Sequence, residues 1–240
     1  MCFSYAINFS PSALKSKFGI DQVPLPQQGF FFNGFDHPNL PILFVPQNEN
    51  DFCVDTSQWG LIPSWVQDQS RVRELQNNAL NARSETAFEK PMFREAWESN
   101  PCIVLASGFF EWQHVDHQKI PHYIYPSNGS MMYMAGIYNH WLNSNTQKLE
   151  STFSILTTHA NPIMEEIHNT KKRMPVILNE DEAFFWLKSD AIERQKMCKP
   201  CSNNDLKSHI VSQKLNYARN NRNQAWAIEP AFFANQTRLF

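Results

Sequence analysis

Residues 102–112 have the sequence CIVLASGFFEW, which is rich in β-branched and aromatic residues. This composition is typical of β-strands, whose pleated surface packs such side chains well. Four more runs of this kind follow: HYIYP (122–126), MMYMAGIYNHW (131–141), TFSILTT (152–158) and MPVIL (174–178). A further short strand is expected near residues 41–45. So many strands predict a sizeable sheet or barrel.

Short helices are predicted between the strands. Residues 11–18 follow Ser10, a good N-cap, and precede Gly19, which can end a helix. Asn179 and Glu182 have the spacing of a capping box at the start of another helix. The other predicted helical segments are residues 92–99, 162–168 and about 180–188.

Strands outnumber helices in this prediction, and the two kinds of element are interspersed. The expected fold class is therefore α+β, with a mixed, largely antiparallel sheet or barrel-like β core and peripheral helices. The sequence contains no internal repeat, Gly/Ser linker or charge block that would mark a boundary. We expect a single domain over residues 1–240.

The composition is that of a folded protein without a strong overall charge. Apolar residues make up 42% of the 240 positions, and 19 Phe and 7 Trp predict an aromatic-rich core. A net charge of −2 restricts nucleic-acid binding to a local basic patch. The chain has no apolar run of the roughly 20 residues that a membrane helix needs, and we recognise no secretory signal. Its five cysteines are odd in number, which does not suggest a set of disulfides. We expect a cytoplasmic protein with free thiols.

The first residues, MCFSYAINF, place a cysteine directly after the initiator Met1. Bulky apolar residues alternate with smaller ones here, which predicts a strand and turns Cys2 away from the aromatic row. If Met1 is removed, Cys2 presents a thiol and an α-amine, and the pKa of an α-amine is about 8. Such an aminothiol can condense with an aldehyde and close a thiazolidine ring. The alternative is a small, semi-buried residue at the start of a strand.

The stretch NARSET (81–86), if extended, sends Asn81, Arg83 and Glu85 to one face. Asn81 can donate and accept hydrogen bonds, and Arg83 can bind a phosphate or carboxylate through two donors. A solvent-facing strand with an Arg–Glu pair explains the pattern equally well.

In SGFFEWQ (107–113), Glu111 stands among three aromatic residues. A carboxyl group in apolar surroundings has a raised pKa, as a proton-transferring acid or base requires. The alternative is a surface glutamate that alternates with buried aromatic residues.

A histidine and a basic cluster occur together in IHNTKKRMPVIL (167–178). His168 can transfer protons, and Lys171, Lys172 and Arg173 can hold phosphates. The same residues also suit a helix C-terminus, where the cations complement the dipole and His168 is a bystander.

Two tryptophans flank a proline turn in WGLIPSW (59–65). Trp59 is expected to pack internally, whereas Trp65 either packs or stacks on an unpaired base.

The segment Cys198-Lys-Pro-Cys201 has the CxxC form of a redox or zinc half-site. A zinc site needs a second pair of ligands, and the sequence has no second CxxC or suitably spaced His pair. His114, His117 and His122 lack acidic or thiol company at ligand spacing. We predict no metal and no cofactor.

Six segments in order resemble the SRAP family, the SOS response-associated peptidases or abasic-site processing proteins. They are Met-Cys at the start, WGLIPSW, NARSET, PMFREAW, CIVLASGFFEW and RMPVIL, over residues 1–178. The resemblance implies a protein that binds single-stranded DNA containing abasic sites and protects the lesion during the DNA damage response. It implies that Cys2 captures the aldehyde of the ring-opened sugar as a covalent thiazolidine, through lyase-like Schiff-base chemistry.

The family's other active-site residues fall on Asn81, Glu111 and His168. The resemblance implies that Asn81 orients the amine or the sugar and that Glu111 and His168 transfer protons. The DNA contacts that it implies are those of Arg83, Arg173, Lys171, Lys172 and Trp65. We expect a monomer that binds no membrane.

This chain departs from the family pattern at two places. The family usually reads Met-Cys-Gly-Arg, whereas Phe3 and Ser4 follow Cys2 here, so the cation beside the nucleophile is absent. The residues NTKK separate His168 from Arg173, where the family has a shorter spacing.

Two other functions would use the same residues. In a thiol peptidase or self-processing enzyme, the Cys2 thiol attacks the Met1–Cys2 bond, with Glu111 and His168 as acid and base. A non-catalytic module would bind single strands through its basic residues and Trp65, without a covalent product. The covalent hypothesis requires an accessible Cys2 sulfur near residues 81, 111 and 168.

Overall fold

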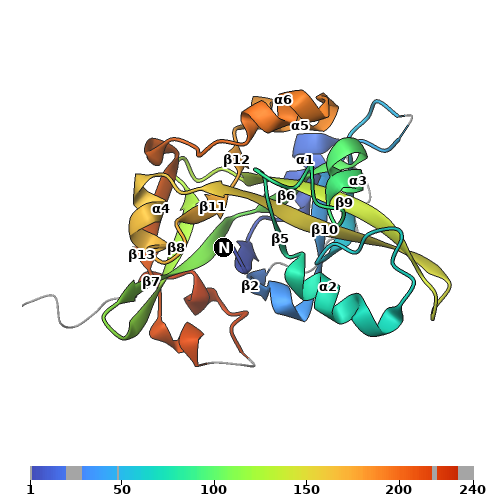
Figure 1. The fold of residues 1–240 in the computed structure, drawn as a ribbon. Coiled ribbons are helices and arrows are strands. Elements are labelled where there is room, and N and C mark those ends of the chain that lie inside the picture. Colours follow the sequence, from blue (N-terminus) through green and yellow to red (C-terminus); the bar gives the residue numbers. More distant parts are fainter. Residues whose placement is uncertain (1, 20–28, 48, 218–220, 232–240) are drawn as a thin grey trace, which may run out of the picture.

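The computed structural model describes residues 2–19, 29–47, 49–217 and 221–231. Within these ranges five strands close into a barrel, in the order β10-β4-β3-β6-β9 with β9 pairing back to β10. They are β3 (Asn39–Phe44), β4 (Cys53–Trp59), β6 (Pro101–Ala106), β9 (Met132–Asn143) and β10 (Lys148–His159). The β10–β4 pair is parallel and the other neighbours are antiparallel. The long β9–β10 hairpin extends to the right in Figure 1.

Three short strands extend the barrel at its edges. They are β5 (Asn81–Arg83), which runs parallel to β10, β11 (Arg173–Pro175), antiparallel to β10, and β12 (Ile177–Leu178), antiparallel to β9. The stretches NARSET and RMPVIL therefore begin on two strands, β5 and β11, that both pair with β10, and RMPVIL continues into β12 beside β9.

A second, antiparallel sheet has the order β13-β8-β7-β1-β2. Its strands are β1 (Ser4–Ile7), β2 (Gly29–Asn33), β7 (Gly108–Val115), β8 (Gln118–Pro126) and β13 (Leu206–Ile210). The chain passes from barrel strand β6 to β7 at Gly108, where an added Cβ would lie 2.5 Å from the Ile124 carbonyl oxygen. Glycine permits this close approach.

Among the described residues, six α-helices lie around the two sheets (Figure 1). They are α1 (Pro11–Phe18), α2 (Val72–Asn78), α3 (Arg94–Ser99), α4 (Pro162–Ile167), α5 (Glu180–Lys188) and α6 (Ala191–Met197). Ser10 caps α1, and Gly19 ends it with φ 69°. Asn179 and Glu182 form the predicted capping box of α5. The 3₁₀ turns are η1 (Gly34–Asp36), η2 (Gln69–Arg71), η3 (Asn203–Asp205), η4 (Gln213–Asn216) and η5 (Ala225–Ala227).

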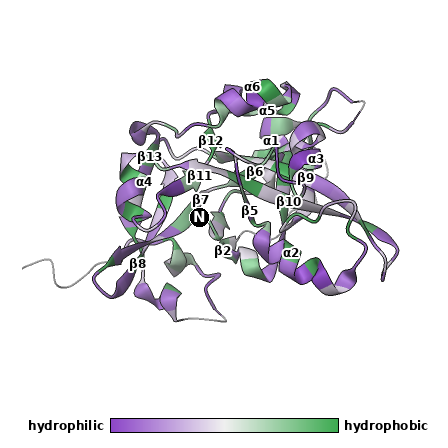
Figure 2. Cartoon of the chain, in the orientation of Figure 1, coloured by the Kyte–Doolittle hydropathy of each residue, from purple (hydrophilic) through white to green (hydrophobic). Residues whose placement is uncertain are grey.

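The core is rich in aromatic side chains, as predicted. Trp59, Trp97, Trp141 and Trp186 are buried, together with Tyr5 and several phenylalanines. Figure 2 shows hydrophobic residues on the central strands and hydrophilic residues along many of the outer segments. The α+β class with a barrel-like core is thus confirmed.

The structure also adds to the predicted elements and shortens two. Helices α2 and α6 and strands β2, β4 and β13 had no clear signal in the sequence. The strand predicted over MCFSYAINF extends only over residues 4–7. In NARSET only residues 81–83 are extended, because the chain turns at Ser84. Among the described residues, no helix combines the length and apolar character needed to cross a bilayer.

Candidate functional site

Cys2 lies two residues before β1, and its side chain is 1% exposed. Its thiol donates a weak hydrogen bond to the Ser4 carbonyl oxygen, over 3.7 Å. Cys2 packs in the same cluster as Tyr5 and Ile7. The prediction that it faces away from the aromatic row was therefore wrong, because the alternation applies only within the strand and β1 begins at Ser4.

The electrostatic surroundings keep the Cys2 thiol protonated. Burial raises the pKa of this thiol far above its ordinary value, and the charge of Glu111 raises it further. The second effect requires Glu111 to lie close to Cys2, although β1 and β7 are about a hundred residues apart in sequence. The β1–β7 pairing, with Tyr5 opposite Phe109, explains the proximity.

Asn81 stands at the start of β5, opposite Ile155 of β10. Its amide Nδ2 donates a hydrogen bond of 2.9 Å to the Cys2 carbonyl oxygen. Its Oδ1 is buried and has no hydrogen-bond partner among the described residues. A buried acceptor without a donor is costly, and it marks a position where a donor is expected to bind.

Glu111 and His168 form a buried pair from different elements. Glu111 lies in the middle of β7 and is 7% exposed, which excludes the surface alternative. His168 caps the C-terminus of α4, and its Nδ1 is 3.6 Å from a Glu111 carboxylate oxygen and 2.8 Å from the Arg173 carbonyl oxygen. We assign the proton to Nδ1, which donates to that carbonyl, so Nε2 carries the lone pair. Burial lowers the pKa of His168, while Glu111 opposes this shift.

Arg173 is directed toward protein groups. Its guanidinium makes two hydrogen bonds to the Glu85 carboxylate, of 2.5 and 2.8 Å, and donates to the Thr157 carbonyl oxygen. Burial alone would raise the pKa of Glu85, but the hydrogen bonds from Arg173 outweigh it, and the pKa is lowered. The pairing joins β11 to the turn after β5. The sequence had suggested Arg83 as the partner of Glu85, and the tertiary structure brings in Arg173.

The other predicted DNA-binding residues are at the surface. Arg83, Lys171 and Lys172 are exposed, and Trp65 is 58% exposed. The Lys172 ammonium nitrogen lies 3.8 Å from a carboxylate oxygen of Glu165, which is in α4. Trp59 is fully buried, as predicted.

A cavity of about 410 Å3 opens beside Glu111 and His168. The residues around it are Phe3, Glu111, Trp112, His114, Lys119, His168, Thr170, Lys171, Leu215, Asn216 and Arg222. We call it the Glu111 cavity. Sequence reasoning missed Lys119, Leu215, Asn216 and Arg222. Lys119 lies on β8, and Leu215 and Asn216 reach the cavity because η4 packs against β8, a contact between segments far apart in the chain.

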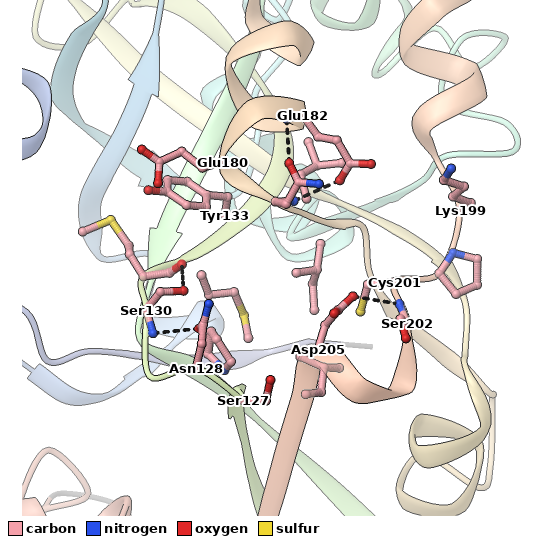
Figure 3. A pocket seen from close by; sticks show the side chains of 18 of the residues that line it. Ser127, Asn128, Ser130, Tyr133, Glu180, Glu182, Lys199, Cys201, Ser202 and Asp205 are labelled. Atoms are coloured by element: carbon pink, nitrogen blue, oxygen red, sulfur yellow. Dashed lines mark hydrogen bonds between the residues drawn. The ribbon is translucent and has the colours of Figure 1, made fainter.

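A second cavity, of about 400 Å3, shares no lining residue with the first. Figure 3 shows it between the start of α5 and the loop around Cys201. Its carboxylates have structural partners: Glu182 caps α5 through Asn179, and Asp205 bonds the Ser202 backbone. We call it the α5 cavity.

All five cysteines have free thiols, including Cys198 and Cys201. Among the described residues, no group of three His, Cys, Asp or Glu side chains is arranged to hold a metal ion.

Fold and site together define a mixed α+β protein in which a cysteine near the N-terminus is held beside a carboxylate, an imidazole and a carboxamide. Comparison with known families then gives a specific match. The family model described as "SOS response associated peptidase (SRAP)" matches residues 1–218. The chain belongs to the SRAP family.

Named relatives and solved structures agree with this assignment. The chain is 32% identical to abasic site processing protein YoqW of Bacillus subtilis, over 92% of this chain and 96% of YoqW. It is also 32% identical to abasic site processing protein HMCES of Xenopus tropicalis, over 82% of this chain but 65% of that protein. A crystal structure of a protein from Bacteroides thetaiotaomicron superposes with a TM-score of 0.87 at 32% identity, covering 96% of this chain and all of that one.

Proposed function

We propose that this protein captures abasic sites in single-stranded DNA through Cys2, once Met1 has been removed. The α-amine of Cys2 attacks the aldehyde of the ring-opened sugar, and loss of one water gives an imine. The thiol then adds to the imine carbon, so that a C–S bond forms and the S–H proton passes to nitrogen. The product is a thiazolidine that links the protein to the lesion.

The observation that carries the proposal is the buried group around Cys2. Asn81 holds the Cys2 backbone and has an unpartnered acceptor oxygen, which suits the N–H of the amine or a sugar hydroxyl. Glu111 and the neutral His168 can pass protons during ring opening, imine formation and reversal. Because the pKa of the Cys2 thiol is raised, the amine acts first and the thiol closes the ring afterwards.

The Glu111 cavity gives access to the site. The expectation of an exposed Cys2 sulfur was wrong, since Cys2 is 1% exposed, whereas the expected neighbours Asn81 and Glu111 are close to it. Glu111 and His168, however, line the cavity. We propose that the sugar enters through this opening and that the aldehyde meets the amine first.

The exposed residues Arg83, Lys171 and Lys172 are proposed to contact phosphates, and Trp65 to stack on an unpaired base. For Arg173, a phosphate contact remains a prediction, since its donors bond Glu85 and Thr157 in this structure. We further propose that residues 1–240 act as one domain and as a monomer.

The test is a denaturing gel with the full chain and a single-stranded oligonucleotide that carries one abasic site. Mass spectrometry first confirms that Met1 is absent. We expect a heat-stable shifted band that a borohydride-reduced abasic site does not give. Cys2→Ala should lose this band but keep an amine that borohydride traps as an imine, whereas Cys53→Ala should behave like the wild type. A wild-type protein without Met1 that gives no band would exclude the proposal.

A second candidate is self-removal of Met1. The Cys2 thiol is next to the Met1–Cys2 peptide bond and near Glu111, and the matching family model carries the word peptidase. Attack of the thiol on the Met1 carbonyl and hydrolysis by water would release Met1 and free the amine. Mass spectrometry of protein made without methionine aminopeptidase tests this: loss of Met1 that depends on Glu111 supports it, and retention of Met1 excludes it.

A further inference from the structure

The Glu111 cavity has an aromatic wall that the capture chemistry does not use. Phe3, directly after Cys2, lines the cavity and is half-buried. Its ring packs against Phe35 of η1, with the centroids 5.1 Å apart and the planes at 38°. Phe35 is itself 43% exposed, so an aromatic pair reaches from the cavity to the surface.

A second aromatic ring contributes to the same cavity. Trp112 follows Glu111 on β7, and its indole N–H donates a hydrogen bond of 2.7 Å to Asn216 Oδ1. This bond fixes the orientation of the indole. Leu215, the neighbour of Asn216 in η4, also lines the cavity. The cavity therefore combines two aromatic rings with an aliphatic side chain.

The rim of the cavity is positively charged. Lys119 and Lys171 both line it, and neither ammonium group takes part in an ion pair with the described residues. Arg222 also lines it, and its guanidinium lies over the Phe31 ring at 5.5 Å. Aromatic walls with cations at the rim are the features that bind single-stranded nucleic acids.

We propose that this cavity takes the nucleobase that neighbours the abasic sugar, turned out of the strand and stacked on Phe3. The inference rests on the proposed capture of abasic sites. A missing base leaves its neighbour stacked on one side at most, so unstacking costs least there. The cavity volume of about 410 Å3 falls in the range of small-ligand sites. Lys119 and Lys171 then neutralise the adjoining phosphates.

The first test is fluorescence of 2-aminopurine, placed on either side of a tetrahydrofuran abasic analogue that cannot form the covalent product. We expect the full chain to quench the probe on one side of the lesion. Phe3→Leu should remove the quenching and weaken binding about tenfold, the size of a typical stacking contribution. Phe185→Leu, at an exposed position on α5, is the matched control and should match the wild type.

The second test removes one surface charge, a change that leaves the core intact. Lys119→Gln should reduce the slope of log affinity against log salt by about 0.7, the value for one phosphate of a single strand. An unchanged slope would contradict the assignment of Lys119.

A parallel denaturing gel with a true abasic site separates the two proposals. Crosslinks that form without quenching on either side, or with equal quenching in Phe3→Leu, overturn the base pocket and leave the capture proposal intact. Quenching that depends on Phe3 without any crosslink supports the pocket and overturns capture.

Discussion

The Glu111 cavity and the α5 cavity are similar in size, and the single carboxylate of the first has different surroundings from the three carboxylates of the second. In the α5 cavity, Glu182 completes a capping box and Glu180 pairs with Lys17 on the exposed side. These carboxylates stabilise helix ends and a surface contact. The positions of Glu180 and Glu182 follow from the start of α5, where acidic residues are favoured.

Beside the Glu111 cavity, buried polar groups from distant segments lie close to one another and to Cys2. Glu111 is buried beside His168, and Asn81 has an acceptor oxygen without a donor among the described residues. No local secondary structure requires Glu111 in the middle of a strand. The comparison teaches that the number of polar groups does not identify a site, whereas a buried carboxylate–imidazole pair and a buried acceptor without a donor do.

The largest expected effect separates the two cavities by chemistry. Glu111→Gln should lower the rate of crosslink formation by about 100- to 10,000-fold, the usual size of a general acid–base contribution. Glu182→Gln, the matched change in the α5 cavity, should leave that rate unchanged. Single-turnover rates from denaturing gels measure both. Equal rates for the two variants would remove the distinction.

Arg173 tests whether a residue near the site acts structurally. Replacing it by Gln breaks the two hydrogen bonds to Glu85 and leaves the Thr157 carbonyl without this donor. We expect a loss of about 2 kcal/mol in the free energy of unfolding, below the range for fully buried pairs because Glu85 is 46% exposed. Urea denaturation measures it. Unchanged stability with weaker DNA binding would instead favour a phosphate contact.

Asn179→Ala should affect stability alone. It removes the side-chain cap of α5, at a cost of about 1 kcal/mol in the free energy of unfolding. Crosslinking by the folded variant should equal that of the wild type. A slower crosslinking rate would show that the two cavities are coupled.

The smallest expected effect concerns pH. Burial lowers the pKa of His122 to about 4, with a contribution from the charge of His209, and His122 lies opposite Glu111 across β7 and β8. Below about pH 6.5 the unfolded chain binds a proton that the folded chain does not, so the free energy of unfolding falls. We expect His122→Gln to reduce this loss by about 0.5 kcal/mol at pH 6, allowing for solvent that reaches the ring. Parallel urea curves at pH 7 and pH 6 test it, and an identical pH dependence in both proteins would contradict it.

Local patterns predicted much of the fold. Composition located β6, β7, β9 and β10, because β-branched and aromatic residues favour strands wherever they are placed. The caps of α1 and α5 were readable because a cap depends on residues within one turn. Helix α2 was missed, since its cap residue Arg71 makes no side-chain hydrogen bond.

The sequence by itself determined the strand-rich class, the capped helices and the identity of Cys2, Asn81, Glu111 and His168 as candidates. The tertiary structure decided that these four residues meet, because the pairing of β1 with β7 and of β5 with β10 joins segments far apart in the chain. It also decided that Arg173 binds Glu85 and that Phe3 faces a cavity. Strand register and packing between distant segments set these contacts, and no local pattern encodes them.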